Sequence, residues 1–323
     1  MNTSQEVPKL AHWLFVFACV FTWPLLFLGG LVTSYRVGMA VPDWPTTFGI
    51  NMFLFNFFNS AWGVFIEHGH RLYGSAVGFC LLIVAPWTLT MKKLAWQFKA
   101  AAVVALLGVI LQGVLGGLRV TRISTELAMI HGCFGQLFFL YLAILAAWSS
   151  DIKNIDFTSH GLTTSKSSLV FLRNLALLVP LSLYFQVVSG AWLRHFQDPM
   201  KLYLHEAVGL TVFALSVMYA VKLRKSGIAK LYRLRRIYLL FVTAVHVQVL
   251  LGFSSWWLMR PFDGIAKPVT DFQALVRTVH QANGALVLAL SGVLAVWVYQ
   301  IIQSISMDSA NSTIIQEETV CLS

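Results

Sequence analysis

Charged residues are scarce in this chain of 323 residues: Asp, Glu, Lys and Arg make up 11% of it, whereas hydrophobic residues make up 58%. A soluble domain typically carries about 25% charged residues. Together with a mean hydropathy of +0.73, this scarcity excludes a soluble globular protein and a disordered one. A membrane-crossing helix needs about 20 apolar residues, so the composition allows about eight of them. The sequence therefore predicts an all-α integral membrane protein.

Cysteines are also few, and they do not form a disulfide framework. Cys19, Cys80 and Cys133 fall inside long apolar runs, and Cys321 lies in the C-terminal tail. No segment expected to face outward contains a cysteine, so we expect no loop disulfide. The first residues lack the Arg-rich amphipathic pattern of a transit peptide, and the apolar run after them is too long for a cleavable signal peptide. A retained first helix in a prokaryotic plasma membrane is the simplest interpretation.

Long apolar runs predict eight membrane-spanning helices with both termini on one side of the membrane. The spans lie near residues 13–34, 70–90, 100–118, 127–148, 168–191, 202–221, 235–257 and 274–303. The N-terminal tail and the segments 91–99, 149–173 and 222–236 hold 14 of the 23 Lys and Arg residues. By the positive-inside rule we expect both termini to be cytoplasmic. The connections 35–69, 119–126, 192–201 and 258–273 would then face outward.

A short Gln-x-x-x-Gly pattern recurs near the outward ends of three odd-numbered spans, at Gln112, Gln186 and Gln248. The first span has Gly29-Gly30 at a comparable depth but no Gln. After each pattern the chain turns, and a histidine opens the next span. We therefore expect two pseudo-repeated four-helix bundles, 1–150 and 165–306, with a cytoplasmic linker at 151–164 and a cytoplasmic tail at 307–323. Close helix packing explains each Gln and Gly alone equally well.

Four of the nine histidines occupy equivalent positions in the four even-numbered spans: His70, His131, His205 and His280. Ionisable groups at the edge of a span are costly and usually functional. Zinc and calcium sites would require cysteines or a carboxylate cluster, and a di-iron site would require Glu-x-x-His on two helices. Two histidines facing each other across a helix bundle instead suit the axial ligation of a haem iron. The sequence thus predicts one bis-histidine haem site in each half.

Arginines at the outward face are candidate partners for haem propionates, because a planar guanidinium pairs well with a carboxylate. The candidates are Arg71, Arg119, Arg194 and Arg277, with Arg122 nearby. Anchoring of a helix at the membrane boundary is the alternative role for each of them.

Glu67 distinguishes the first histidine from the other three. It lies three residues before His70, and the two share a helix face if the helix already runs there. A carboxylate at the low-dielectric edge of a span can act as an acid, a base or a cation stabiliser. Leu202 and Arg277 occupy the equivalent positions before His205 and His280. We therefore expect the N-terminal half to be the reaction site and the C-terminal half to hold a permanent haem. In the alternative, Glu67 orients His70 or pairs with Arg71.

Together these features resemble the haem A synthase family of membrane enzymes. The resemblance rests on Gly29-Gly30-Leu-Val-Thr-Ser, Pro42-Asp43-Trp44-Pro45, Glu67-x-x-His70-Arg71, Gln112-Gly-x-x-Gly-Gly-x-Arg-Val-Thr121, His131, His205 and His280. It implies oxidation of the C8 methyl of haem O to a formyl group, by successive hydroxylations and loss of water, for the biogenesis of haem-copper oxidases. It also implies that His70 and His131 flank the substrate haem, that Glu67 is the essential acid, and that His205 and His280 ligate a haem b cofactor. Many members carry a cysteine pair in the first outer loop, which this sequence lacks.

Two non-enzymatic functions use the same four histidines: a di-haem b electron carrier of the membrane, and a haem transporter or chaperone. For the enzyme, the expected partners are haem O, an electron donor, a haem O synthase, oxidase assembly factors, lipid and a second copy of the chain. We expect no nucleic-acid partner, because the net charge of +10 is explained by cytoplasmic anchoring residues, mainly those of 222–236.

Overall fold

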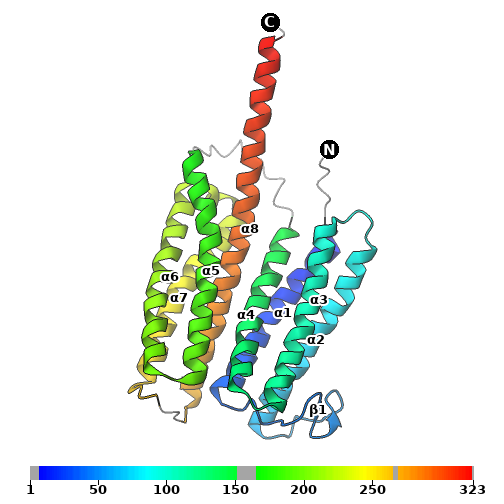
Figure 1. Ribbon diagram of the computed structural model, residues 1–323, viewed down its shortest axis with the longest axis vertical. Helices are drawn as coiled ribbons and strands as arrows, with labels where there is room; N and C mark the ends of the chain where they lie inside the picture. Colours follow the sequence, from blue (N-terminus) through cyan, green and yellow to red (C-terminus); the bar gives the residue numbers. More distant parts are fainter. Residues whose placement is uncertain (1–6, 151–164, 265–267, 322–323) are drawn as a thin grey trace.

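A computed structural model describes residues 7–150, 165–264 and 268–321 of the chain. The described part contains eight α-helices long and apolar enough to cross a membrane, which confirms the predicted multi-pass, all-α membrane fold (Figure 1). They are α1 (Lys9–Ser34), α2 (Trp62–Thr90), α3 (Trp96–Thr121), α4 (Thr125–Trp148), α5 (Lys166–Phe196), α6 (Pro199–Lys225), α7 (Tyr232–Leu258) and α8 (Asp271–Cys321). A 3-10 turn, η2 (Ile228–Lys230), links α6 to α7. The predicted linker 151–164 lies outside the described residues.

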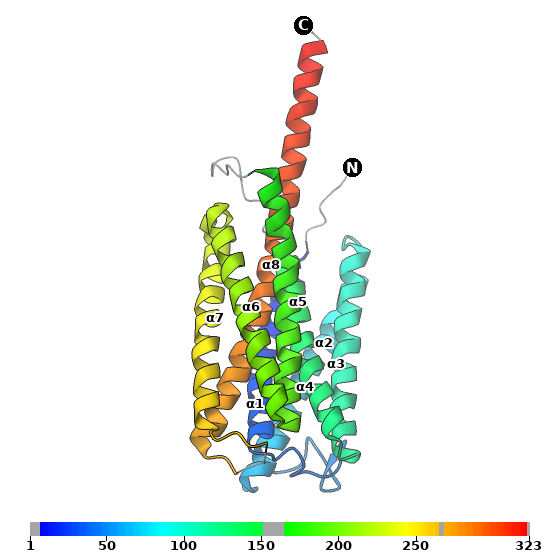
Figure 2. The ribbon, with the colours of Figure 1, turned by 60° about the vertical axis from the view of Figure 1, so that its left-hand side comes forward.

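Helix α8 lies between the other helices and contacts members of both predicted bundles. It packs against α1 and α4 on one side and against α5 and α7 on the other (Figure 1, Figure 2), and it is the most buried of the eight spans. Small residues line part of this interface, including Ala143 of α4 and Ala285 and Ala289 of α8. Small side chains let helix backbones approach closely in a membrane, where no hydrophobic effect drives helices together.

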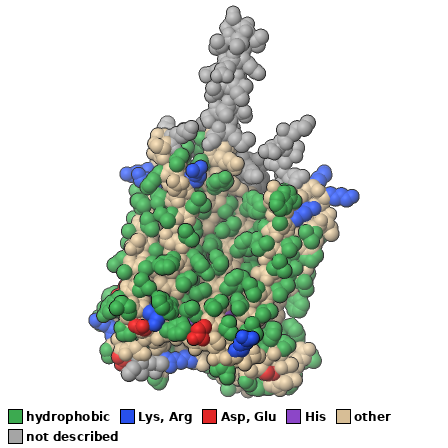
Figure 3. Space-filling model, viewed as in Figure 1, with side chains coloured by type: hydrophobic (Ala, Val, Ile, Leu, Met, Phe, Trp, Pro, Cys, Tyr) green, Lys and Arg blue, Asp and Glu red, His purple; other side chains and the backbone are tan. Residues whose placement is uncertain are grey.

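The side surface of the bundle is apolar, and the charged side chains lie toward its two ends (Figure 3). Exposed Leu, Phe, Ile, Val and Trp side chains cover the outward faces of the helices, as lipid contact requires. The described ends of the chain, the start of α1 and the end of α8, lie at the same end of the bundle, opposite the β-hairpin of the first loop (Figure 1).

Helix α2 begins at Trp62, eight residues before the predicted start of that span. The prediction that His70 opens its helix is therefore wrong. Polar residues usually end a span, but here Glu67 and Arg71 form an ion pair of i,i+4 spacing, 2.8 Å between Oε1 and Nη2, so that both charges are neutralised within the helix. The helix therefore already runs at Glu67, so that Glu67 and His70 lie on the same helix, as their sharing of a helix face requires.

The other three histidines also lie inside their helices rather than at the ends. His131 is six residues after the start of α4, His205 is six residues into α6 and His280 is nine residues into α8. At 1.5 Å per residue, these positions lie about 9 to 13 Å from the helix start. All four rings are therefore inside the bundle, below the loops. Helix α8 differs from prediction at its other end, since it continues through Cys321 into the segment expected to be a tail.

The contact between α4 and α8 allows a direct test of the packing. A Cβ added at Gly292 would collide with Leu140 and come within 3.2 Å of Ile144. Because overpacking of this kind typically costs about 1–3 kcal/mol, we expect Gly292→Leu to lower the apparent melting temperature of the detergent-solubilised protein. Gly113 of α3 has nothing within 4 Å of its added Cβ, so Gly113→Leu is the matched control. Equal melting temperatures for the two variants would contradict this packing.

Candidate functional site

The structure brings the four predicted histidines together as two pairs of nearly identical geometry. His70 of α2 faces His131 of α4, with ring centroids 6.4 Å apart and ring planes at 80°. His205 of α6 faces His280 of α8, with centroids 6.3 Å apart and planes at 86°. The same spacing and nearly perpendicular rings thus occur once in each predicted half.

This spacing fits two imidazoles on opposite sides of one metal ion. An imidazole nitrogen lies about 1.1 Å from its ring centroid and binds a metal at about 2 Å, so two such rings have centroids about 6.3 Å apart. The Nδ1 atoms of His70, His131 and His280 are buried and have no hydrogen-bond partner in the described protein. Among the described residues, no group of three or more His, Cys, Asp or Glu side chains could hold a metal. Each pair therefore suits a haem iron, whose four remaining ligands come from the porphyrin.

Each of the four histidine rings lies directly on a glycine of the neighbouring odd-numbered helix. A Cβ built on Gly29, Gly116, Gly190 or Gly252 would lie 3.1, 3.0, 2.8 or 3.1 Å from Cε1 of His70, His131, His205 or His280, respectively. A Cβ at Gly190 would force the His205 ring to shift, and a Cβ at any of the other three glycines would require the ring to give way by a few tenths of an ångström. The glycines of the repeated pattern therefore set the depth and orientation of the rings, a role that the sequence pattern alone did not separate from helix packing.

The glutamines of the repeat hold the histidine-bearing turns from the same neighbouring helices. Gln112 Nε2 donates a hydrogen bond to the backbone carbonyl of His131 (3.0 Å), and Gln186 Nε2 donates to that of His205 (2.9 Å). Gln248 accepts from Asn283 Nδ2 (2.8 Å) on α8. Each glutamine therefore ties one histidine helix to the helix that supplies the glycine.

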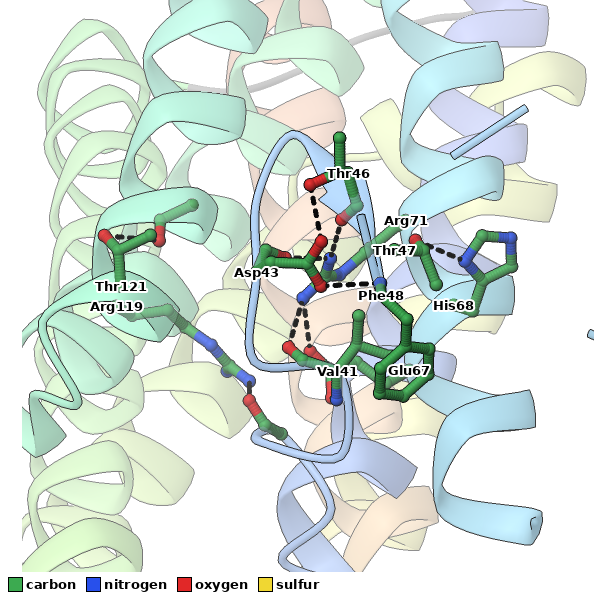
Figure 4. Close-up of polar contacts among 12 residues, drawn as sticks. Val41, Asp43, Thr46, Thr47, Phe48, Glu67, His68, Arg71, Arg119 and Thr121 are labelled. Carbon is green, nitrogen blue, oxygen red and sulfur yellow. Dashed lines mark hydrogen bonds and ion pairs between the residues drawn. The ribbon is translucent and has the colours of Figure 1, made fainter. Parts of the chain in front are cut away.

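Glu67 is buried and joins α2 to the first loop, between α1 and α2 (Figure 4). One carboxylate oxygen accepts from Arg71 Nη2 (2.8 Å), and the other accepts from the backbone N–H of Val41 (3.0 Å). Arg71 also donates to the carbonyls of Val41 (2.8 Å), Asp43 (2.7 Å) and Thr46 (3.2 Å). The pairing of Glu67 with Arg71, which the sequence left open, is thus observed. The remaining hydrogen bonds of the Arg71 guanidinium go to backbone carbonyls of the first loop.

The other predicted propionate partners, Arg119, Arg194 and Arg277, form no salt bridge with an acidic side chain among the described residues. Arg119 donates to the carbonyl of Gly38 (2.9 Å) and interacts electrostatically with Glu67 and His70. Arg194 donates to Gln281 (2.5 Å), Gly30 (2.7 Å) and Ser34 (2.6 Å), but its Nε has no partner.

Asp43 holds a tight hairpin in the first loop, between α1 and α2. Strands β1 (Thr46–Thr47) and β2 (Ile50–Asn51) pair in antiparallel fashion. The two turn residues between them, Phe48 and Gly49, have positive φ values of 51° and 77°, as a type I′ turn requires. The Asp43 carboxylate accepts from Phe48 N (2.8 Å), Gly49 N (2.9 Å) and Thr46 Oγ1 (2.5 Å). A second tie links the hairpin to α2, where Thr47 Oγ1 lies 3.1 Å from His68 Nδ1.

These hydrogen bonds set the charge state of Asp43. Partial burial would raise the pKa of its carboxyl group, but the donors Gly49, Thr46 and Phe48 outweigh that effect and lower the pKa from 3.8 to about 2. Because the folded-state pKa is depressed, the charged Asp43 stabilises the hairpin at neutral pH. That contribution is lost as the pH falls from about 4 through about 2.

Replacing Asp43 with Asn should therefore loosen the hairpin at neutral pH. We expect faster protease cleavage within residues 36–61 of the solubilised Asp43→Asn protein than of the wild type, and a smaller difference near pH 2 with an acid-active protease. Asp198→Asn is the matched control, since Asp198 is another acid in a connection between two helices that accepts a backbone hydrogen bond, from Met200 N (2.8 Å). Cleavage of the 36–61 loop at the wild-type rate in Asp43→Asn would contradict the assignment.

Comparison with known proteins identifies the family. Residues 11–202 match the family COX15-CtaA, described as cytochrome oxidase assembly protein, and no curated protein matches the chain. The match covers more than half of the 323 residues, from α1 into α6, and includes Glu67, His70 and His131. This confirms the resemblance noted in the sequence. The chain is a multi-pass membrane protein that belongs to the COX15-CtaA family of cytochrome oxidase assembly proteins.

Proposed function

We propose that the protein is a haem A synthase, which oxidises the C8 methyl of haem O to a formyl group for haem-copper oxidases. The observation that carries the proposal is an asymmetry between two histidine pairs whose ring geometry is nearly identical. Only the N-terminal pair has a buried acid within one helical turn of a ligand: Glu67 is the one Asp or Glu among the buried side chains of the described protein. A pure electron carrier needs the pairs but has no use for this carboxylate.

In the N-terminal half, His70 and His131 would hold the iron of the substrate haem O. Each hydroxylation would convert one C–H bond of the methyl carbon to C–OH, a two-electron oxidation that needs an oxidant; with dioxygen as the oxidant, two electrons from the donor and two protons convert the second oxygen atom to water. After two such steps the resulting gem-diol loses water and leaves the aldehyde. Glu67 would stabilise positive charge that develops at the methyl carbon or accept the proton released there. Its orientation is fixed by Arg71 and by the Val41 N–H.

In the C-terminal half, His205 and His280 would hold a haem b. A bound haem b supplies one-electron transfer between an external electron donor and the reaction site. Ser189 Oγ lies 3.0 Å from His205 Nδ1, and with Gln186 it fixes the ring from α5. Arg194 and Arg277, with no acidic partner among the described residues, are the proposed partners of its propionates.

The distribution of Lys and Arg residues supports the proposed orientation of the protein in the membrane. The Lys- and Arg-rich connections lie at the end of the bundle that holds the chain termini, so the positive-inside rule places that end in the cytoplasm. The histidine pairs then lie toward the periplasmic face of a prokaryotic plasma membrane. Haem O would enter sideways from the bilayer, with its farnesyl tail in lipid or under the aromatic residues of the first loop.

Glu67→Gln tests the proposal. The chain is expressed together with a haem O synthase, and the extracted haems are identified by mass spectrometry. Wild type should yield haem A, and Glu67→Gln should yield at least ~100-fold less per protein, since general acid–base catalysis typically contributes that much or more. The haem b content of each variant, which reports on the site at His205 and His280, serves as the measure of correct folding. Glu206→Gln is the matched control, because Glu206 adjoins His205 but is exposed.

Two outcomes would contradict the proposal at different levels. Undiminished haem A in Glu67→Gln would refute the role of Glu67 alone. If wild-type protein with a full complement of haem contained neither haem A nor a hydroxylated intermediate, the synthase function would be wrong, and an electron carrier or a haem transporter would remain.

A further inference from the structure

The turn that carries His70 is held differently from the other three histidine turns. Around His131, His205 and His280, the glycine four residues after the histidine lies against a glutamine amide, with 2.9 to 3.0 Å between the added Cβ of Gly135, Gly209 or Gly284 and Nε2. At His70 the equivalent Gly74 meets Leu25, with 3.9 Å to each of its terminal carbons. Leu25 lies four residues before Gly29 and so occupies the place of the glutamine.

Because leucine stands where the other helix pairs have glutamine, the side-chain hydrogen bond between the two helices, α1 and α2, is missing at this position. Gln112 and Gln186 donate to the backbone carbonyls of His131 and His205, whereas the side chain of Leu25 has no donor. The backbone of Leu25 contacts the His70 ring, as the backbones of Gln112 and Gln248 contact the rings of His131 and His280, but the Leu25 side chain makes only apolar contact, at ordinary distance, with the turn of His70. Such contact is less directional than a hydrogen bond and resists a small displacement of the turn less.

Loop contacts take over where the glutamine is missing. Glu67 and Arg71 flank His70 within the same two turns, and outside α2 their hydrogen-bond partners among the described residues are backbone atoms of the first loop: Val41, Asp43 and Thr46. The ring of His70 rests on Gly29 of α1 like the other three rings on their glycines, but the side-chain hydrogen bonds that hold its turn go to a loop, whereas those of the other three turns go to a neighbouring membrane helix. Loops yield more readily than packed helices.

We propose that His70 is the displaceable ligand of the substrate haem, and that Leu25 makes it so. This inference rests on the proposed haem site. An iron with two axial histidines has no vacant position, so one ligand must give way before an exogenous ligand can bind. Of the four histidines, His70 is the one whose turn has no glutamine tie to the adjacent helix. Leu25 and the Glu67–Arg71 pair are therefore positioning residues for that ligand.

Carbon monoxide, which binds reduced haem only at a free or freed position, is the probe. In protein loaded with haem in both halves, we expect about one CO bound per chain, at the N-terminal haem. Leu25→Gln should supply the missing amide and lower CO binding at least severalfold, with a larger low-spin fraction in the visible spectrum. The reciprocal variant Gln186→Leu should free His205 in the same way and raise CO binding toward two per chain.

The readout does not require turnover, so it separates this inference from the proposed function. CO binding and spin state that are unchanged in Leu25→Gln would overturn the role of Leu25 even if haem A is made. Loss of CO binding in Leu25→Gln would support the inference even if haem A is not made. Unchanged CO binding in Gln186→Leu would overturn the claim that the glutamine fixes its histidine.

A separate observation concerns the opposite end of the C-terminal half. A cavity of about 630 Å³ lies between α6 and α7 and opens to the surface of the bundle. Its wall is mostly apolar, with Val217, Ala220, Phe241 and Val245 among its residues. Pockets of this size hold small ligands or lipid tails.

Basic side chains gather at the end of this cavity near the 222–236 connection. Arg224, Lys225 and Lys230 line it there, and none of them has an acidic partner among the described residues. Deeper in the cavity, Ser216 is 1% exposed, and its hydroxyl has no hydrogen-bond partner in the described protein. An apolar groove with three cations at its mouth and an unpaired hydroxyl inside matches a lipid with an anionic headgroup.

The geometry points to a binding site for an anionic phospholipid, with its phosphate on Arg224, Lys225 and Lys230 and an acyl chain along the α6–α7 groove. Native mass spectrometry of the purified full chain with phosphatidylglycerol or phosphatidylcholine tests it. We expect phosphatidylglycerol to bind at least tenfold more tightly. The triple variant Arg224→Gln, Lys225→Gln, Lys230→Gln should abolish that preference.

Lys92→Gln, Lys93→Gln, Lys99→Gln is the matched control, because it removes three charges from a connection at the same end of the bundle. It should leave the preference intact. Equal binding of the two lipids to wild type, or an equal loss in the control, would show general surface charge instead of a site and would overturn the proposal.

Discussion

An imidazole ring resting on the bare backbone of a glycine is the contact on which this membrane bundle depends. It occurs four times, between α1 and α2, α3 and α4, α5 and α6, and α7 and α8, with too little room for a Cβ at any of them unless the ring gives way. The contact fixes how closely each helix pair approaches and how deep its histidine lies. Two such pairs face each other in each half, which gives the ring separations of 6.3 and 6.4 Å. The spacing that suits a haem iron is therefore a result of helix packing.

The glycine–histidine contact recurs in four helix pairs, and in three of them it is accompanied by a glutamine. Positions that depart from this repeat are therefore the candidates for chemistry. Both clear departures lie at His70: Leu25 replaces a glutamine, and Glu67 adds a buried acid. A buried charge in an apolar medium must be paired, and Arg71 pairs it while joining it to the loop. The turn of His70 thus has side-chain hydrogen bonds to a loop, where the other histidine turns have them to a neighbouring helix. The C-terminal pair keeps the regular arrangement, as expected of a site that retains its haem.

Much of the fold could be predicted from the sequence, because hydropathy alone identifies spans in a medium that allows few other structures. The pairing of His70 with His131 and of His205 with His280 could be anticipated from the repeat. The start of α2 could not, since Glu67 and Arg71 are neutralised by each other and by loop carbonyls that lie 25 to 30 residues away in sequence. The contact of Gly116 with His131 depends on the register between two helices, which spacing does not give. The absence of a glutamine from the first span was readable from the repeat, but that Leu25 stands in its place was not, because two adjacent glycines, Gly29 and Gly30, both fit the pattern and only the contact of Gly29 with His70 fixes the register.

The most direct test of the account is whether each histidine pair holds one iron from opposite sides. Protein made without a haem O synthase should contain haem b at His205 and His280, and low-temperature electron paramagnetic resonance of the ferric form reports on those ligands. The account predicts a strongly anisotropic low-spin signal, characteristic of imidazole planes near the observed 86°, and its loss in both His205→Ala and His280→Ala. A low-spin signal that survives in either variant would contradict the account.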